Sequence, residues 1–193
     1  MRIFLAGATG IIGRRIVPLL REAGHDVAGM TRSQANVNML RALGAEPVVC
    51  DAFDAAGVHD AVTGFAPDLV MHQLTDLPDD AARVHELGGA NARIRRLGTR
   101  ALLAAAAASR VERFFVQSVA WTIPGDGGEA VAEMEELVLG VEGVVLRYGR
   151  FHGPGTYFPT EAPRPPCVHI DTAAVRTVAL LDHASGIVTI TDD

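Results

Sequence analysis

The sequence predicts an α/β fold, a doubly wound parallel sheet in a single domain, and three observations lead to that class. Short aliphatic runs alternate with longer amphipathic runs along the chain, and such alternation favours parallel strands joined by helices. The length of 193 residues suits one domain with a full hydrophobic core. A glycine-rich turn, Gly7–Gly13, stands where the first strand would give way to the first helix.

The expected strands are short and mostly apolar on both sides of their alternation, which is typical of parallel strands covered on both faces. Hydrophobic residues make up 49% of the chain and aromatic residues only 5%, so we expect an aliphatic core. The seven expected strands are residues 2–6, 26–30, 46–49, 68–71, 113–117, 143–147 and 186–190.

The expected helices fill the intervals between these strands. Three of them end at a glycine, Gly24, Gly44 or Gly64, the residue that best adopts the left-handed conformation after a helix. From residue 153 to residue 166 the chain carries five prolines, which predicts an ordered but irregular surface loop. The six expected helices are residues 11–23, 33–43, 55–64, 90–109, 129–140 and 171–182.

The composition excludes several kinds of chemistry. The chain has no lysine, and its 17 basic residues, all arginine, face 23 acidic residues for a net charge of −6. Without lysine there is no Schiff base and no lysine of a phosphate-binding loop. The acidic balance argues against a nucleic-acid partner. No apolar run approaches the ~20 residues that span a bilayer, and we find no signal peptide, so we expect a cytoplasmic protein that binds no membrane.

The cysteines and histidines give no sign of a metal site or a disulfide. Cys50 and Cys167 lie far apart in the sequence, and we expect both to be packed thiols with no bond between them. No group of histidine, cysteine and acidic residues has the spacing of metal ligands, so no metal is expected.

The glycine-rich turn predicts a dinucleotide site, because it follows a strand and opens a helix. Gly7 suits a tight turn with positive φ, Gly10 leaves room for a diphosphate, and Gly13 lets the helix pack close to the strand. The free N–H groups at the start of the helix would face the phosphates, around Thr9, Ile11 and Ile12. The alternative is a structural turn in another α/β fold.

Arg32, 19 residues after Gly13, stands where a site that prefers NAD places an acidic residue. Arginine fits a 2′-phosphate with two hydrogen bonds, and the hydroxyls of Thr31 and Ser33 can add donors. This position favours NADP(H) over NAD(H), the alternative being a solvated arginine at a helix start. Asp51, followed by Ala52, would either bind the adenine edge or cap the following helix.

Taken together, these residues resemble the extended and atypical branch of the short-chain dehydrogenase/reductase superfamily. That branch contains NAD(P)-dependent epimerases and dehydratases and NmrA-like proteins, and the resemblance implies a Rossmann fold. It covers essentially the whole chain. The segments that carry it are residues 7–13, Asp51 and residues 67–72, 98–103, 115–118, 146–155 and 168–174.

The resemblance also shows which catalytic residues are missing. In active members a serine or threonine holds the substrate oxygen, a tyrosine moves the proton, and a lysine four residues later lowers the pKa of that tyrosine. Ser118 fills the first role, but residues 119–145 contain no tyrosine and the chain contains no lysine. The substrate-binding lobe is reduced to a loop, residues 149–170, of the single domain 1–193.

Three residues are the candidates for catalysis: Ser118, Tyr148 and His152. Histidine titrates near neutrality and can supply a proton, although a core or loop histidine explains His152 equally simply, and the ring of Tyr148 is better suited to packing. The cofactor-binding residues that we expect are Gly7, Thr9, Gly10, Ile11, Ile12, Gly13, Thr31, Arg32, Ser33, Asp51, Ala52, Gln73, Leu74 and Ser118.

Two further charge patterns on helices have simple explanations. The arginines Arg93, Arg95, Arg96 and Arg100 would form a solvated face or pair with the acidic helix 129–140, in which Glu133, Glu135 and Glu136 would be solvated. Helices 90–109 and 129–140 are also the elements through which superfamily members commonly dimerise, so a homodimer is expected there.

The sequence therefore favours an NADP(H)-binding oxidoreductase, or an epimerase/dehydratase-like protein. It would act on a small carbonyl or hydroxyl substrate with a non-standard proton donor. The alternatives are a catalytically inactive NmrA-like sensor or regulatory partner, and a cofactor-binding structural partner of another enzyme. Fold-level resemblance alone does not choose among them.

Overall fold

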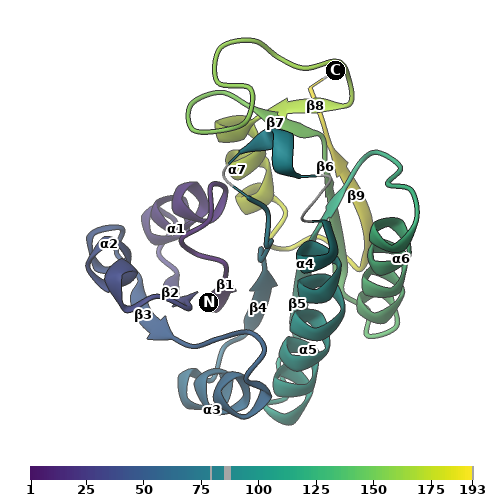
Figure 1. Cartoon of the computed structure of the whole chain (residues 1–193). Helices are drawn as coiled ribbons and strands as arrows, with labels where there is room; N and C mark the ends of the chain where they lie inside the picture. Colours follow the sequence, from purple (N-terminus) through teal and green to yellow (C-terminus); the bar gives the residue numbers. More distant parts are fainter. Residues whose placement is uncertain (79, 85–87, 193) are drawn as a thin grey trace.

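The computed structural model describes residues 1–78, 80–84 and 88–192. Its centre is a seven-stranded sheet of order β3-β2-β1-β4-β5-β6-β9, in which all paired strands run parallel. The predicted doubly wound sheet is confirmed (Figure 1). The strands are β1 (Arg2–Ala6), β2 (Asp26–Thr31), β3 (Glu46–Val49), β4 (Leu69–His72), β5 (Arg113–Val119), β6 (Val144–Tyr148) and β9 (Gly186–Ile190).

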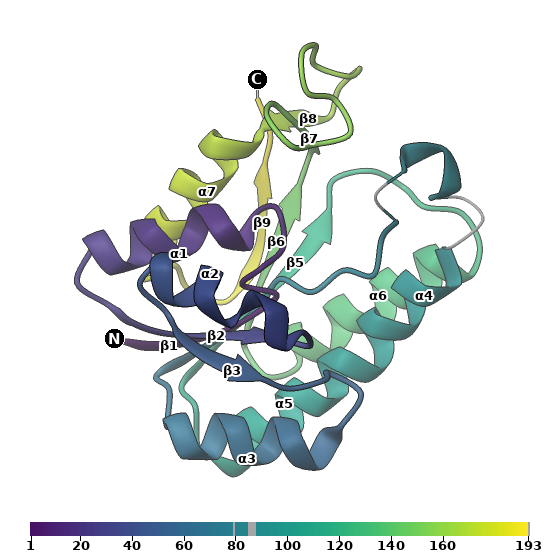
Figure 2. The ribbon, with the colours of Figure 1, turned by 60° about the vertical axis from the view of Figure 1, so that its left-hand side comes forward.

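Helices cover both faces of the sheet, as a parallel sheet requires. The helices α1, α2 and α7 lie on one face, and α3, α4, α5 and α6 lie on the other (Figure 2). The helices are α1 (Gly13–Glu22), α2 (Val37–Ala42), α3 (Ala55–Phe65), α4 (Gly88–Arg93), α5 (Thr99–Ala108), α6 (Asp126–Leu139) and α7 (Ile170–Ala179), with the 3-10 turns η1 (Gln34–Asn36) and η2 (Ala81–Arg83).

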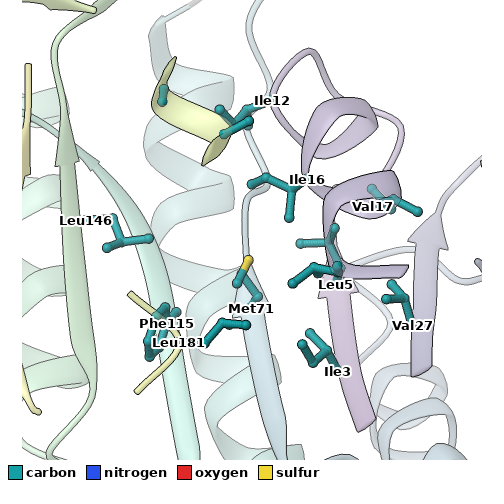
Figure 3. Packing of buried hydrophobic residues seen from close by; sticks show 14 of the residues in the cluster. Ile3, Leu5, Ile12, Ile16, Val17, Val27, Met71, Phe115, Leu146 and Leu181 are labelled. Carbon is teal, nitrogen blue, oxygen red and sulfur yellow. The ribbon is translucent and has the colours of Figure 1, made fainter. Parts of the chain in front are cut away.

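The core is mostly aliphatic, as the composition predicts, and it forms one layer on each side of the sheet. On the α1 side, Ile16 packs over Ile3 and Leu5 of β1, beside Met71 of β4 (Figure 3). Phe4, Phe115 and Tyr148 are the aromatic residues among the largest fully buried side chains. The strands are therefore fixed from both faces, and their carboxyl ends form a rigid edge for a site.

The structure differs from the sequence prediction in the helix expected at 90–109. It contains α4 and α5, and between them a π-helical turn, η3 (Ile94–Gly98). Such a wider turn inserts one extra residue per hydrogen-bonded ring and often occurs at functional sites. Amphipathic periodicity does not reveal it, because within the turn the charged Arg95 is buried and the apolar Leu97 is exposed.

The helix ends are predicted correctly at two glycines and wrongly at the third. Gly24 and Gly44 have φ of +83° and +90° directly after their helices. Gly64 lies inside α3 instead, and the left-handed residue after that helix is Ala66, with φ of 49°. None of the described helices is both long enough and apolar enough to cross a membrane.

A second, two-stranded parallel sheet was not predicted. It consists of β7 (Arg150–His152) and β8 (Cys167–His169), and it flanks the proline-rich loop at one end of the molecule, beside the C-terminus (Figure 1). Asp192 is hydrogen-bonded to this sheet, since its N–H donates to the Cys167 carbonyl at 2.7 Å.

Candidate functional site

The glycine-rich turn forms a tight cradle at the carboxyl end of β1. Gly7 has φ of +89°, and the N–H of Gly10 donates to its carbonyl at 3.0 Å. A Cβ on Gly13 would lie 2.2 Å from the Gly7 oxygen, so only glycine fits there. Among the described residues, a Cβ on Gly10 would have only the Gly7 oxygen within 4 Å, at 3.2 Å. The turn is therefore closed on its inner side and open on the outer side, as a diphosphate group requires.

Beside this turn, the side chain of Gln73 offers a second feature suited to a polar ligand. The residue is 3% exposed, and its Oε1 is buried without a hydrogen-bond partner among the described residues. A Cβ on Gly7 would touch the Gln73 backbone oxygen at 2.6 Å, which places the two residues in contact. A buried acceptor without a partner is costly. Together with the open glycine turn, it fits a dinucleotide with amide and hydroxyl donors.

The candidate specificity residue, Arg32, extends from the end of β2. Its side chain is 70% exposed, and its Nη2 lies 3.6 Å from Asp76 Oδ1. Thr31 is buried, and its hydroxyl accepts hydrogen bonds from Ser33 N at 3.3 Å and Asn36 Nδ2 at 3.2 Å. Thr31 therefore holds the turn that presents Arg32.

Asp51 lies exposed after β3, and it does not cap the next helix. Its Oδ1 accepts from Phe53 N at 2.9 Å, while the cap of α3 is Asp54, which accepts from Gly57 N at 3.0 Å. The helix-cap alternative for Asp51 was wrong, because the N-cap is Asp54, three residues later, and the helix begins at Ala55. The neighbouring Ala52 is buried in the core, and the role of Asp51 at adenine stays a prediction.

Ser118 belongs to a buried polar cluster on the α6 side of the sheet. Its Oγ donates to Glu135 Oε1 at 2.5 Å. Arg147 donates to both oxygens of the same carboxylate, from Nε at 2.9 Å and from Nη2 at 2.5 Å. Ser118 is 1% exposed and Glu135 is 6% exposed. The only proton of the Ser118 hydroxyl is therefore already committed to a carboxylate.

The prediction that Glu135 is solvated was wrong, because the residue faces inward on α6. It shares its buried face with Ala130, Met134 and Val138. The helical spacing of Ala130, Met134 and Val138 could have revealed that face. Glu133 behaves as expected and accepts from Arg96 at 2.9 Å.

The arginine run also divides into exposed and buried members. Arg96 pairs with Asp126 at 2.7 Å as well as with Glu133, and Arg100 lies 3.9 Å from Glu133. Arg95 is different: it is 8% exposed and lies in η3. Burial lowers the pKa of Arg95, while the charge of Glu135 acts in the opposite direction.

Tyr148, the second candidate for catalysis, is a core residue. It is 1% exposed, and its hydroxyl lies 2.6 Å from Thr177 Oγ1, which itself donates to the Ala173 carbonyl. Burial raises the pKa of the Tyr148 hydroxyl well above its usual value. A buried phenol with a raised pKa is a poor proton donor, so the structure argues against a catalytic role for Tyr148.

His152, the third candidate, is held in the small sheet. Its Nε2 lies 2.8 Å from Asp192 Oδ2, and its ring packs edge-on against His169 with 5.2 Å between ring centroids. Ligand atoms of His152, Cys167 and Asp192 lie within 4.8 Å of one another, so these three could hold a metal ion. The spacing in the sequence does not predict this group, because these residues are far apart in the chain and only the fold brings them together.

The three catalytic candidates do not converge on one point. The side chain of Ser118 contacts α6, whereas Tyr148 contacts α7 on the opposite face of the sheet, and His152 pairs with the C-terminal segment. Beside Ser118 and Glu135 lies an open groove of about 450 Å³. Its lining includes Trp121, Ile123, Val131, Ala132, Glu135 and Arg147.

Comparisons with known proteins agree with this geometry. The sequence profile of the NAD dependent epimerase/dehydratase family matches residues 3–140. The 3-diazoavenalumate denitrifying reductase of a Streptomyces species is 33% identical over 237 residues, which cover 100% of this chain and 76% of that protein.

Solved structures of similar shape support the fold. The UDP-glucose 4-epimerase of Thermus thermophilus, in complex with NAD, has a TM-score of 0.79 at 21% identity, and the match covers 99% of this chain and 78% of that one. The UDP-Glc/GlcNAc 4-epimerase of Campylobacter jejuni has a TM-score of 0.80 at 14% identity, covering 98% and 78%. At these identities the likeness concerns the fold alone.

Proposed function

Because the chain belongs to the NAD-dependent epimerase/dehydratase family, we propose that it is a nicotinamide-dependent reductase whose substrate accepts hydride without a proton from the protein. When bound, the dinucleotide supplies the hydride. The Gly7–Gly13 turn holds its diphosphate, and Gln73 accepts one of its donors.

The observation that carries this proposal is the lack of an available acid among the described residues at the strand ends. Ser118 donates its proton to Glu135. Tyr148 is buried with a raised pKa, His152 lies in the small sheet and pairs with Asp192 and not with Ser118, and the chain has no lysine. Reduction of a carbonyl produces an alkoxide that needs an acid, whereas these residues offer a carboxylate.

The relative from Streptomyces suggests which substrates need no acid, since its name describes a denitrifying reductase of a diazo compound. In an aryl diazonium ion, hydride replaces dinitrogen. A C–H bond forms at the ring carbon, the C–N bond breaks, and N2 leaves with the C–N electron pair. The nicotinamide is oxidised, the charges balance, and no proton is consumed. We assign this chain to that substrate class.

The experiment that tests the proposal follows the transfer of deuterium, not the absorbance of NADPH. Diazonium ions react with many reagents, so loss of absorbance alone would not show hydride transfer. We expect the protein with NADPH deuterated at C4 to transfer one deuterium to the arene formed from benzenediazonium, at a rate above that without protein. Benzaldehyde, acetophenone and a benzoquinone serve as comparison acceptors.

The outcomes separate the candidate functions. Reduction of the carbonyl compounds without deuterated arene would contradict the proposal and restore the expected carbonyl substrate with a non-standard proton donor. Tight NADPH binding with no turnover of any acceptor would favour the sensor or regulatory role.

We also propose that NADP(H) is preferred over NAD(H), on the position of Arg32. The epimerase structures of similar fold include complexes with NAD, but their identity to this chain is low. Arg32 is exposed at the end of β2, where a guanidinium can bind a 2′-phosphate with two hydrogen bonds.

The cofactor preference is tested with Arg32→Ala. Hydrogen bonds to charged groups contribute roughly 1.5–3 kcal/mol, so we expect NADPH affinity to fall at least about tenfold while NADH affinity changes little. Fluorescence titration measures both. Arg41→Ala, which removes another arginine of the same region, serves as the control. Equal losses for the two dinucleotides in Arg32→Ala would refute the assignment.

A further inference from the structure

The small sheet β7–β8 and the segment after β9 bring together three side chains of the kinds that bind metal ions. They are His152 of β7, Cys167 of β8 and Asp192, and one ligand atom of each lies within 4.8 Å of the others. An imidazole nitrogen, a thiolate and a carboxylate oxygen are all ligands that zinc takes in proteins. The three residues come from separate segments, so the fold itself assembles this group.

The pairing of β7 with β8 explains why His152 and Cys167 lie on the same side of the small sheet. Arg150 pairs with Cys167, and His152 pairs with His169. Side chains two residues apart on a strand share a face, and the rings of His152 and His169 are in contact, with 5.2 Å between their centroids. His152 and Cys167 are therefore placed diagonally across one face.

Asp192 is held beside this face by the backbone of β8, near the chain end (Figure 1). Its N–H donates to the Cys167 carbonyl at 2.7 Å, and its Oδ2 accepts from the His169 N–H at 2.8 Å. The carbonyl of the preceding residue, Thr191, accepts from Arg176 Nη1 at 2.6 Å. The carboxylate is therefore in position before any metal binds, which lowers the entropic cost of forming a site.

The distances within the group are close to those around a coordinated zinc ion. His152 Nε2 lies 2.8 Å from Asp192 Oδ2, whereas two such ligands of a tetrahedral zinc ion are roughly 3.3 Å apart. They would separate by about 0.5 Å, and rotation of the Cys167 side chain would bring its sulfur to roughly 3.6 Å from each. Zinc would take the place of the shared hydrogen, and the neutral imidazole would carry its proton on Nδ1.

Charge and access also favour a divalent cation. The thiolate of Cys167 and the carboxylate of Asp192 would supply two negative charges, which neutralise Zn2+ while His152 stays neutral. Cys167 is 7% exposed, but the side chains of His152 and Asp192 are 18% and 36% exposed. The group is therefore closed around the thiol and open on the carboxylate side, where solvent can fill the fourth position of a tetrahedral ion.

We propose that His152, Cys167 and Asp192 form a zinc site that joins the C-terminal segment to the small sheet. The Cys167 thiol gives up its proton to solvent as the sulfur–zinc bond forms, and no electron is transferred. The ion would tie the two strands that flank the proline-rich loop to the segment after β9. This site is independent of the proposed reductase function, because zinc binding requires neither cofactor nor substrate.

The test uses the full chain, without an affinity tag that binds metal, and follows Co2+ in place of zinc. Cobalt bound to a thiolate gives a sulfur-to-metal charge-transfer band in the near ultraviolet, which nitrogen and oxygen ligands do not give. We expect this band in the native protein and not in Cys167→Ser. The matched control is Cys50→Ser, which removes the other cysteine of the chain and should keep the band. Zinc should abolish the band by displacement, and Mg2+ should not.

Zinc affinity gives a second measurement that does not depend on the thiol. We expect His152→Gln and Asp192→Asn each to bind zinc at least about tenfold more weakly, since even the loss of an outer-shell partner has an effect of this size. His59→Gln, at an exposed position of α3, is the control and should bind zinc like the native protein. If Cys167→Ser does not fold, these variants decide the proposal.

Each outcome counts for or against the site. A charge-transfer band that persists in Cys167→Ser, or that is lost in Cys50→Ser, would overturn the proposal. No band in the native protein would also overturn it, and so would native zinc affinity in both His152→Gln and Asp192→Asn. The three residues would then be a hydrogen-bonded cluster only. Failure of the deuterium-transfer assay would remove the proposed reaction and leave the zinc site in place.

Discussion

His72 is the clearest case of a single polar side chain whose chemistry is set by its position. It ends β4 and is 1% exposed, with Leu74 N donating to one ring nitrogen and Thr99 bound to the other. Because Leu74 donates to Nδ1, the proton of the neutral ring lies on Nε2 and is donated to Thr99. The ring is therefore a neutral structural group.

This burial predicts a dependence of stability on pH. The pKa of His72 is lowered from 6.5 to about 3 in the folded protein, so below pH 6.5 the unfolded chain binds a proton that the folded chain does not. Stability is full above pH 6.5 and falls by roughly 1.4 kcal/mol per pH unit down to about pH 3. From pH 7 to pH 5 we expect the native protein to lose roughly 2 kcal/mol more than His72→Asn.

Urea unfolding at the two pH values measures this difference. His59→Asn, at an exposed position of α3, is the control and should keep the native dependence. Parallel curves for the native protein and His72→Asn would show that His72 is protonated in the folded state.

At the scale of elements, the glycine turn and the first helix act as one unit. The carbonyl of Gly7 lies where a Cβ of residue 13 would stand, so the close approach of α1 to the turn depends on the missing side chain. The proposed dinucleotide site depends on this contact and on the helix N-terminus that it positions.

Gly13→Ala should therefore weaken cofactor binding strongly. The added Cβ would lie 2.2 Å from the Gly7 oxygen, and the turn must open to accommodate it, which moves the N–H groups away from the phosphates. We expect at least a tenfold loss of NADPH affinity in a fluorescence titration. Gly64→Ala is the control, since its Cβ would meet no atom within 4 Å inside α3. It should bind normally and gain up to ~1 kcal/mol of stability. Normal binding by Gly13→Ala would contradict this account.

The elements also show what could be predicted from the sequence. The strands of the large sheet were correct to within two residues, because buried parallel strands are continuous apolar runs between turn signals. The π-helical turn and the inward position of Arg95 were missed, since an arginine in a run of arginines predicts a solvated face. The small sheet β7–β8 was missed because three-residue strands carry no periodic signal.

At the scale of the whole molecule, the sheet order sets the position of the site. The chain reverses its direction of winding between β1 and β4, and ligands of such sheets bind at this switch point beyond the carboxyl ends of the strands. The glycine turn and Gln73 lie there, as predicted. The arrangement of the three catalytic candidates was harder to predict. They lie on separate strands, and the face of the sheet that each side chain occupies is known only once the strands are paired.

Two predictions concern the molecule as a unit and stay predictions. One is a homodimer through α5 and α6, the helices that lie within residues 90–109 and 129–140. Exposed apolar side chains occur in or next to these helices, at Leu97, Leu139 and Val141. The other is that residues 149–170 replace a substrate-binding lobe in the single domain 1–193. Residues 149–170 contain the small sheet β7–β8 and the proline-rich loop between its two strands.

The hydrogen bond from Ser118 to Glu135 also bears on how the protein would behave among the aldehydes and ketones of a cell. An alkoxide formed beside Ser118 would find no proton, because the Ser118 hydroxyl already donates to Glu135, so hydride would return to the nicotinamide. Such compounds could enter the groove without being consumed. The lack of a proton donor beside the nicotinamide would then keep common metabolites from consuming the reduced cofactor.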